Sequence, residues 1–339
     1  MVDERPHRRI FELLACIIVC GICLQILTVS DIINNVTMRT SPEQLFYDKF
    51  VAEQHFRWNR SANFPAQFDD RNCFFNQTAT ENMQHVCGFS METCLNNSQL
   101  RLFVPDFELT PWTSLETKYG TLRSGSWAPC ECRSQTRMAV VVPYRLRKFH
   151  LNVFLNNIIA LLQFQRQAFT IFIIEHTHDV AFNRGASFNA AFRIIQRLRY
   201  KYDCYVLHDV DMVNENLCNY YQCGAHPRHL SVQVEKAGYA LYYKQYVGGV
   251  TALSTSIVEQ INGMSNLFFG WGGEDDNLYA RLVRRQNYRV QRYDANIGRY
   301  ATLEHEHSEK LNTEMTLHKV SVCTCTHCAC TRRITCPHC

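Results

Sequence analysis

The sequence predicts an α/β protein with a Rossmann-like mixed, mainly parallel sheet flanked by helices, and two observations carry this prediction. From about residue 138 onward, short β-rich runs alternate with helical patterns, an order typical of parallel strands joined by crossover helices. Runs such as 138–142 and 171–174 are apolar throughout, as expected for strands buried on both faces. The chain has 339 residues, of which 46% are hydrophobic, so it can bury a large core of one or two domains.

The predicted elements follow one another regularly. Apolar and β-branched content predicts strands at 138–145, 169–176 and 204–211, and helical periodicity predicts helices at 149–165 and 183–200. Neither a Gly-x-Gly-x-x-Gly turn nor a Gly-x4-Gly-Lys-Ser/Thr loop follows a strand, so the phosphate cradles of dinucleotide-binding and P-loop proteins are missing. The net charge of +4 is scattered and forms no basic stripe, so no nucleic-acid partner is expected.

The N-terminal region predicts a membrane anchor. Residues 13–29 are almost wholly apolar, at the short end of the range for a spanning helix. Arginines precede this run and Asp31 follows it, so the positive-inside rule places residues 1–12 in the cytosol and the body of the protein in the lumen. A short span suits the thinner membranes of the early secretory pathway. A cleavable signal peptide is the alternative, but no small-x-small cleavage site follows the run.

Two further features agree with a lumenal body. Residues 30–95 are polar and weakly periodic, which predicts a stem. N-glycosylation sequons occur at Asn35, Asn59, Asn76 and Asn96. Of seventeen cysteines, three lie in the predicted span, and the remainder would meet an oxidising compartment, so disulfide bonds are expected.

Two pairs of polar residues are candidates for holding a divalent cation. Asp209 and Asp211 end a predicted strand, and acids two apart in extended chain point the same way. Open α/β sheets bind ligands at the carboxyl ends of their strands, where hard oxygen ligands suit a cation that bridges a diphosphate. His305 and His307 also lie two apart, and with Asp211 they would form a mixed nitrogen and oxygen set that suits Mn²⁺. Each pair alone is also typical of an ordinary solvated surface.

Residues 268–279, "FFGWGGEDDNLY", join aromatics and glycines to three adjacent acids, Glu274, Asp275 and Asp276. The segment "EDDNLYARLVRR" predicts a helix whose first-turn acids and last-turn arginines suit the helix dipole, and the acids would then be a capping cluster. In the other interpretation, the glycines admit a ligand, Trp271 offers an apolar face to a sugar ring, and an acid accepts a hydroxyl proton. Composition alone favours neither interpretation.

Five motifs together resemble the animal β-1,4-galactosyltransferases. In the order and spacing of that family they are "PYRLR" (143–147), "FNRGASFNAAF" (182–192), "HDVDMV" (208–213), "YVGGVTALS" (246–254) and "NGMSNLFFGWGGEDDNLYARL" (262–282). The similarity covers about residues 94–310, and the Gly-Trp-Gly-Gly-Glu-Asp-Asp run is highly specific. The resemblance implies a GT-A fold and a single-pass type II enzyme of the Golgi membrane. The catalytic domain would span residues 96–320 and lie in the lumen, with a Cys-rich tail at 321–339.

The resemblance also implies a role for each matching position. Asp275 would be the catalytic base, with Glu274 and Asp276 orienting the acceptor, and Asp211, His305 and His307 would bind Mn²⁺. The donor, UDP-galactose, would be held by Pro143, Tyr144, Arg145, Arg147, Phe182, Arg184, Asp209, Val210, Lys236, Tyr246, Trp271 and Gly272. The acceptor glycan would be held by Trp271, Gly273, Glu274, Asp275 and Asp276. Tyr246 stands where a tyrosine favours UDP-galactose over UDP-N-acetylgalactosamine. Two disulfides are implied, Cys204–Cys223 and Cys94–Cys132.

The sequence departs from the family pattern in two places. The His305-Glu-His307 spacing resembles the branch that acts on xylose of the proteoglycan linker, whereas Gly273 resembles the branch that acts on N-acetylglucosamine. We expect terminal β-linked N-acetylglucosamine as acceptor and keep xylose as the alternative. Only thirty-two residues follow His307, fewer than the family usually has, and the Cys-rich tail could bind zinc, form disulfides or be an alternative end. A catalytically weak glycan-binding protein is therefore a second hypothesis. The oligomeric state is not predicted.

Overall fold

The computed structural model describes the backbone of residues 24–28 and all atoms of residues 86–88, 94, 105–120, 122, 125–130, 132–176 and 181–305. Its centre is a run of three parallel strands, in which β3 (Arg137–Tyr144) lies between β4 (Ala168–His176) and β5 (Cys204–His208). Almost every residue of these strands is buried, as their unbroken apolar sequence predicts.

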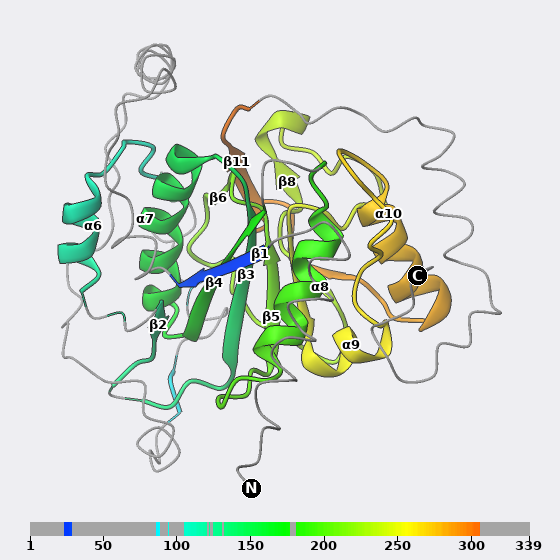
Figure 1. Cartoon of the computed structure of the whole chain (residues 1–339), viewed down its shortest axis with the longest axis horizontal. Helices are drawn as coiled ribbons and strands as arrows, with labels where there is room; N and C mark the ends of the chain where they lie inside the picture. Colours follow the sequence, from blue (N-terminus) through cyan, green and yellow to red (C-terminus); the bar gives the residue numbers. More distant parts are fainter. Residues whose placement is uncertain are drawn as a thin grey trace, which may run out of the picture.

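Helices cover both faces of the sheet. Figure 1 shows α6 (Trp112–Lys118) and α7 (Lys148–Phe164) on one side, and α8 (Arg184–Ile195), α9 (Thr255–Gln260) and α10 (Glu274–Tyr279) on the other. Alternate residues of β3 enter two separate cores: Met138, Val140 and Val142 pack with α7, whereas Ala139 and Val141 pack with α8. The predicted β-α-β-α-β order is therefore confirmed.

The sheet is more mixed than expected. Its strand order is β1-β4-β3-β5-β9-β7-β10, and β2 also pairs with β4. The remaining bounds are β1 Leu24–Thr28, β2 Ser126–Trp127, β7 Arg228–His229, β9 Val250–Ser254 and β10 Gln291–Arg292. Because β9 runs antiparallel to both β5 and β7, the expected parallel arrangement holds for the central three strands and for the β7–β10 pair.

A smaller sheet stands at the carboxyl end of the main one, in the order β6-β11-β8. Its strands are β6 (Met212–Asn214), β8 (Gln233–Val234) and β11 (Arg299–Thr302). The 3-10 turn η2 (Glu235–Ala237) follows β8, and the π-helical segment η3 (Ala280–Arg285) continues α10. A helix over 274–285 is thus confirmed, but its π turn carries no distinct pattern in the sequence.

Several predictions about the ends of the chain lie outside the described residues. These are most of the stem, the four sequons at Asn35, Asn59, Asn76 and Asn96, the predicted metal ligand His307 and the tail at 321–339. The structure corrects part of the predicted spanning helix at 13–29, because Leu24–Thr28 form the strand β1, which pairs antiparallel with β4. Among the helices that the structure describes, none is both long and apolar enough to cross a membrane.

The structure corrects one disulfide prediction. Cys204 is bonded to Cys223 as expected, but Cys94 is bonded to Cys218 and Cys132 to Cys87. A β-bridge between Val86 and Arg133 sets Cys87 beside Cys132, a pairing that the motifs do not reveal.

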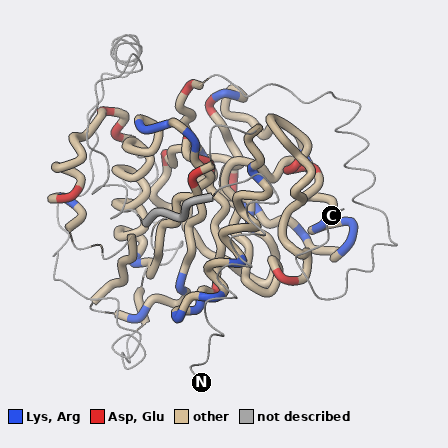
Figure 2. Tube along the Cα trace, in the orientation of Figure 1, with Lys and Arg blue, Asp and Glu red and all other residues tan. Residues whose placement is uncertain are grey.

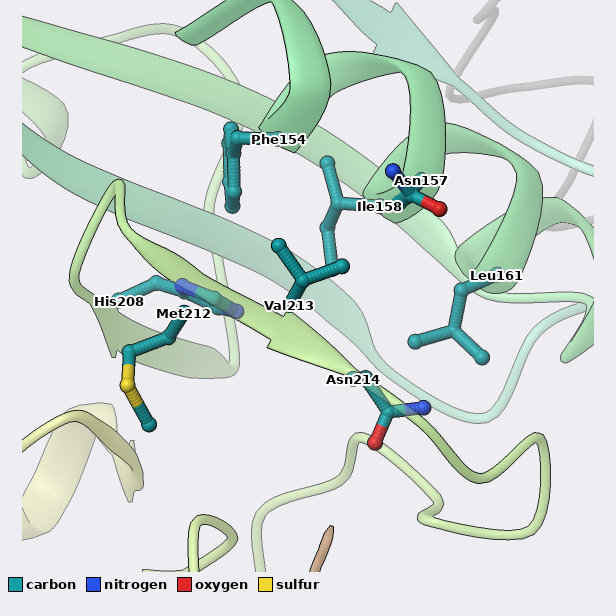
Figure 3. Close-up of a pocket in the computed structure, with 8 residues that line it drawn as sticks. All are labelled: Phe154, Asn157, Ile158, Leu161, His208, Met212, Val213 and Asn214. Atoms are coloured by element: carbon teal, nitrogen blue, oxygen red, sulfur yellow. The ribbon is translucent and has the colours of Figure 1, made fainter. Parts of the chain in front are cut away.

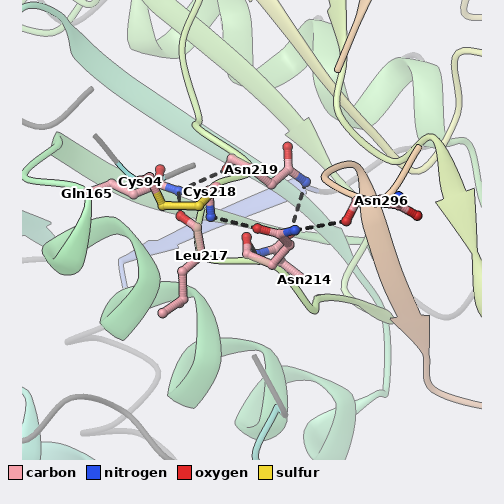
Figure 4. Close-up of a disulfide and its surroundings, with 8 residues drawn as sticks. Cys94, Gln165, Asn214, Leu217, Cys218, Asn219 and Asn296 are labelled. Carbon is pink, nitrogen blue, oxygen red and sulfur yellow. Dashed lines mark hydrogen bonds between the residues drawn. A yellow bond between two sulfur atoms is a disulfide. The ribbon is translucent and has the colours of Figure 1, made fainter. Parts of the chain in front are cut away.

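Buried hydrogen bonds position the loop that carries Cys218 (Figure 4). Gln165, at the end of α7, donates to the carbonyl groups of Leu217 and Asn219, and Asn216 accepts from the Cys218 amide. The loop is therefore fixed against α7, where it meets Cys94. Cys130 is also disulfide-bonded, so every cysteine in the described part of the chain takes part in a disulfide.

Candidate active site

Functional side chains gather where the three central strands end. The predicted residues that follow these strands are, in chain order, Arg145, Arg147, Phe182, Arg184, Asp209 and Asp211. Because β3, β4 and β5 are parallel, the segments after them meet at one edge of the sheet. The Arg145 guanidinium lies 5.1 Å from the centre of the Phe182 ring. Figure 2 shows acidic and basic residues close together near the middle of the molecule, whereas the lower edge, near the amino ends of β3 and β5, is mainly basic.

The Arg184 guanidinium joins the two predicted acidic motifs. Its Nε lies 2.7 Å from Oδ1 of Asp209, and its Nη1 lies 2.7 Å from Oδ1 of Asp275 and 3.7 Å from Oε1 of Glu274. Burial tends to lower the pKa of Arg184, but the three carboxylates raise it well above its ordinary value, so the side chain stays charged. Asn183 caps α8 by accepting from the Ala186 amide, which fixes the start of the helix that carries Arg184.

The first turn of α10 presents the acids to this cation. Gly272 and Gly273 have φ values of 105° and 91°, a left-handed conformation that glycine adopts without strain, and the chain turns there into α10. Burial and the charge of Asp275 raise the pKa of Glu274 to about 8, although Arg184 lowers it. The Asp275 side chain keeps 19% of its surface exposed, so a bound hydroxyl group can reach it.

Gly248 lies directly against Asp275. A Cβ atom at this position would lie 2.3 Å from Oδ2 of Asp275 and 2.6 Å from the hydroxyl oxygen of Tyr246. Only glycine therefore lets both side chains approach this stretch of backbone. Burial, followed by the charges of Asp275 and Asp209, raises the pKa of Tyr246 well above its ordinary value, so the phenol stays neutral.

Asp211 and His305 form the second half of the site. β11 pairs antiparallel with β6 in the register Thr302 to Met212, and this pairing brings the residues beyond β11 to Asp211. Nδ1 of His305 lies 3.1 Å from Oδ2 of Asp211. Burial raises the pKa of Asp211, but the hydrogen bond and charge of His305, with Arg147, lower it to a net value of about 2.

This pair fits part of a manganese site. A carboxylate oxygen and an imidazole nitrogen that converge are ligand types that Mn²⁺ accepts. The His150 ring lies 6.0 Å from that of His305, and burial lowers the pKa of His150 to about 4, so it is neutral at pH 7. In the described residues no group of three His, Cys, Asp or Glu side chains could hold a metal ion. The third predicted ligand, His307, lies outside them.

Exposed aromatic side chains accompany the acids. Trp271, Tyr242 and Tyr243 are 49%, 45% and 43% exposed. The Tyr243 hydroxyl donates to Oδ1 of Asp276 at 2.8 Å, and both tyrosines pack edge-on against Tyr246, with ring centres 5.0 and 5.5 Å away. Flat apolar faces with polar tips beside carboxylates can pack on a sugar ring. Tyr242 and Tyr243 were not predicted, although the aromatic run "YYKQY" that ends at Tyr246 could have signalled them.

The other predicted positions have different surroundings. Pro143 and Tyr144 end β3 and are buried, and Val210 is buried between the two aspartates. Lys236 is exposed on η2, which packs against β11. Their contacts with a donor stay predictions from the resemblance.

A small cavity lies between α7 and the β5–β6 segment (Figure 3). His208, Met212 and Asn214 line one side of it, and Phe154 and Asn157 line the other. Its volume is about 10 Å³, room for about one water molecule. The cavity is therefore far too small for a sugar nucleotide.

Comparison with known proteins places these features in a sequence family. Residues 91–224 match the N-terminal region of glycosyl transferase group 7, and residues 228–306 match the N-terminal domain of galactosyltransferase. The chain is 39% identical over 207 residues to Beta-1,4-galactosyltransferase 6 of Rattus norvegicus, which covers 61% of this chain and 50% of that protein. It is 32% identical over 279 residues to Beta-1,4-galactosyltransferase 5 of Sus scrofa. This match covers 80% of the present chain and 71% of that relative.

The first of these matches spans about half the length of the relative. Among solved structures, the chain is similar to the catalytic domain of Drosophila beta1,4galactosyltransferase 7 in complex with xylobiose. That similarity has a TM-score of 0.47 and 28% identity, and it covers 53% of this chain and 79% of the other.

Proposed function

The chain belongs to the animal β-1,4-galactosyltransferase family, and we propose that it transfers galactose from UDP-galactose, in a Mn²⁺-dependent and inverting reaction, to the 4-hydroxyl group of a terminal β-linked N-acetylglucosamine. The observation that carries the proposal is the arrangement around Arg184. Its ion pairs bring Asp275 to Asp209, two residues from Asp211, so a candidate base and a candidate metal ligand lie at the same edge of the sheet. We also propose that the fold is of the GT-A type.

In this reaction Asp275 accepts the proton of the acceptor hydroxyl while that oxygen attacks the anomeric carbon of galactose. The bond between the anomeric carbon and the diphosphate oxygen breaks, its electron pair leaves with UDP, and the configuration inverts. Mn²⁺ held by Asp211 and His305, with His307, would supply positive charge against the departing diphosphate. Arg184 holds the Asp275 carboxylate in place, and the exposed face of Trp271 supports the sugars.

The test uses the purified full-length chain, UDP-galactose, Mn²⁺ and a panel of β-linked N-acetylglucosamine and xylose acceptors. We expect product with N-acetylglucosamine acceptors and a loss of about 10²- to 10⁴-fold in kcat for Asp275→Asn, as for the loss of a general base. The matched control is Asp294→Asn, which makes the same change at an exposed position. Transfer to xylose alone would overturn the acceptor assignment, and transfer to no acceptor despite normal donor binding would overturn the enzymatic proposal.

The same experiment tests the hypothesis of a non-catalytic glycan-binding protein. That hypothesis requires UDP-sugar or glycan binding that survives Asp275→Asn, with no product from either chain. Product that disappears in the variant excludes it.

The proposed cellular location is the Golgi membrane, with residues 13–29 as a type II anchor and the catalytic domain in the lumen. The apolar run and the charges around it support this proposal, whereas the pairing of Leu24–Thr28 with β4 counts against a spanning helix over the whole run. Protease protection of the body of the protein in sealed microsomes, together with glycans at Asn35 and Asn59, is the expected result. A body that protease digests without detergent would contradict it.

A further inference from the structure

A buried histidine lies behind the loop that meets Asp275. His229, in β7, has no exposed surface. Its Nε2 lies 3.0 Å from the Gly248 carbonyl oxygen, and its Nδ1 lies 3.1 Å from Nε of Arg292. Arg292 is its neighbour across the parallel β7–β10 pair, so the sheet register itself creates this contact.

The partners of His229 fix how its ring is protonated. Burial and the charge of Arg292 lower the pKa of His229 to about 3, although the bond to Gly248 raises it, so the ring is neutral. A guanidinium group can only donate, so Nδ1 must accept from Arg292. The single ring proton is therefore on Nε2 and is donated to the Gly248 carbonyl.

The same small group of side chains holds the whole loop from Lys244 to Val250. Nη2 of Arg292 donates to the Tyr246 carbonyl at 2.8 Å and to the Lys244 carbonyl at 3.1 Å. The Ser231 hydroxyl donates to the Gly248 carbonyl at 3.1 Å and accepts from the Val250 amide at 2.9 Å.

This loop carries the two positions that approach Asp275, since Gly248 lies against its carboxylate and Tyr246 stands beside Gly248. The His229 ring also packs edge-on against the Tyr246 ring, with centres 5.5 Å apart. A shift of the loop would therefore move the phenol and change the contact between Gly248 and the Asp275 carboxylate.

We propose that His229 and Arg292 are positioning residues, which hold the loop so that Asp275 and Tyr246 keep their places beside the donor sugar. The proposal rests on the proposed function and deepens it, because it assigns the choice between galactose and its larger N-acetylated analogue partly to residues behind Tyr246. A network that served only stability would leave that choice unchanged.

The test compares His229→Phe, which keeps a ring but removes both hydrogen bonds, with Arg292→Lys, whose single ammonium group cannot serve His229 and two carbonyls together. The matched controls are Tyr221→Phe and His226→Phe. The first removes buried hydrogen bonds to Tyr300 and His208, and the second makes the same exchange of histidine for phenylalanine outside the network. Full-length proteins are assayed with UDP-galactose and UDP-N-acetylgalactosamine.

We expect His229→Phe to lower kcat with UDP-galactose about tenfold or more, with a smaller change in KM, because the reacting groups lose their alignment. The ratio of kcat/KM for the N-acetylated donor to that for UDP-galactose should rise, and Arg292→Lys should show the same trend. A folded His229→Phe protein with wild-type kcat and donor ratio would overturn the proposal.

Hydrogen exchange measured by mass spectrometry separates this outcome from failure of the proposed function. Exchange in the segment 244–250 should speed up in His229→Phe and Arg292→Lys but not in Tyr221→Phe. If the wild-type chain transfers no sugar, the proposed function fails, and unchanged exchange in this segment would independently show that His229 does not hold the loop.

Discussion

A single methyl group added at Gly248 should disable the site without unfolding the protein. In Gly248→Ala, the new Cβ atom would lie 2.3 Å from Oδ2 of Asp275, whereas ordinary contact begins at 3.4 Å. One of the two groups must then move by about 1 Å, since the gap between these distances has to open. One charge-assisted hydrogen bond resists movement of the carboxylate, because Arg184 lies 2.7 Å from Asp275 and is itself fixed by Asp209. A displacement of about 1 Å at a reacting group can cost about 10²-fold in rate, which corresponds to about 2.7 kcal/mol of activation free energy.

The assay measures kcat and KM for UDP-galactose with Gly248→Ala and with Gly224→Ala, where a Cβ atom would meet its nearest neighbour at an ordinary 3.8 Å. We expect kcat to fall about 100-fold in the first variant and to stay within about twofold of wild type in the second. Thermal unfolding of both variants checks that the loss is local. Wild-type kcat in a folded Gly248→Ala protein would refute either the placement of Gly248 against Asp275 or the proposed role of that carboxylate as the base.

Two further predictions concern stability. The folded-state pKa of Glu274, about 8, lies above its ordinary value of 4.5, so its contribution to stability is present below about pH 4.5 and is lost as the pH rises towards 8. The melting temperature of Glu274→Gln should therefore rise relative to that of the wild type between pH 5 and pH 8. A difference in melting temperature that does not change with pH would contradict the raised pKa. The Cys94–Cys218 bond closes a segment of 124 residues and the Cys204–Cys223 bond one of 19. The loss of chain entropy in the unfolded state predicts that these bonds stabilise the fold by about 5 and about 3 kcal/mol. Urea unfolding should therefore show a larger loss of unfolding free energy when Cys94 and Cys218 are both replaced by alanine than when Cys204 and Cys223 are. The reverse order would contradict this explanation.

Much of the fold follows from local sequence pattern. The apolar runs 138–142 and 171–174 fit strands buried on both faces, and the structure places them in β3 and β4. Pairing between distant segments is different, because it depends on tertiary packing. Nothing local predicts that β9 runs antiparallel to β5, or that Cys94 meets Cys218 rather than Cys132.

The same distinction applies to the site. The acidic motifs can be recognised in the sequence, and the resemblance to a family assigns a role to each acid. Asp211 and Asp275 could therefore be named as candidates from the sequence. The residues that position them carry no motif of their own. His229 reads as an ordinary core histidine, and Gly248 reads as a turn glycine until its missing side chain is seen to face a carboxylate. Contacts of this kind appear only once the β7–β10 register and the turn into α10 are known.

The crowding of acids at residues 274–276 also finds a physical explanation. One guanidinium cannot neutralise Asp209, Glu274 and Asp275 together, so the cluster would carry excess negative charge if every member were ionised. Burial raises the pKa of Glu274 to about 8 and that of Asp209 to about 6, so Glu274 is the member of the cluster that takes up a proton most readily. A protonated Glu274 can donate a hydrogen bond to a sugar hydroxyl, while Asp275, paired with Arg184, remains the hydrogen-bond acceptor beside it. Two adjacent carboxyl groups can thus acquire opposite hydrogen-bonding roles from their surroundings alone, as the proposed binding of an acceptor sugar requires.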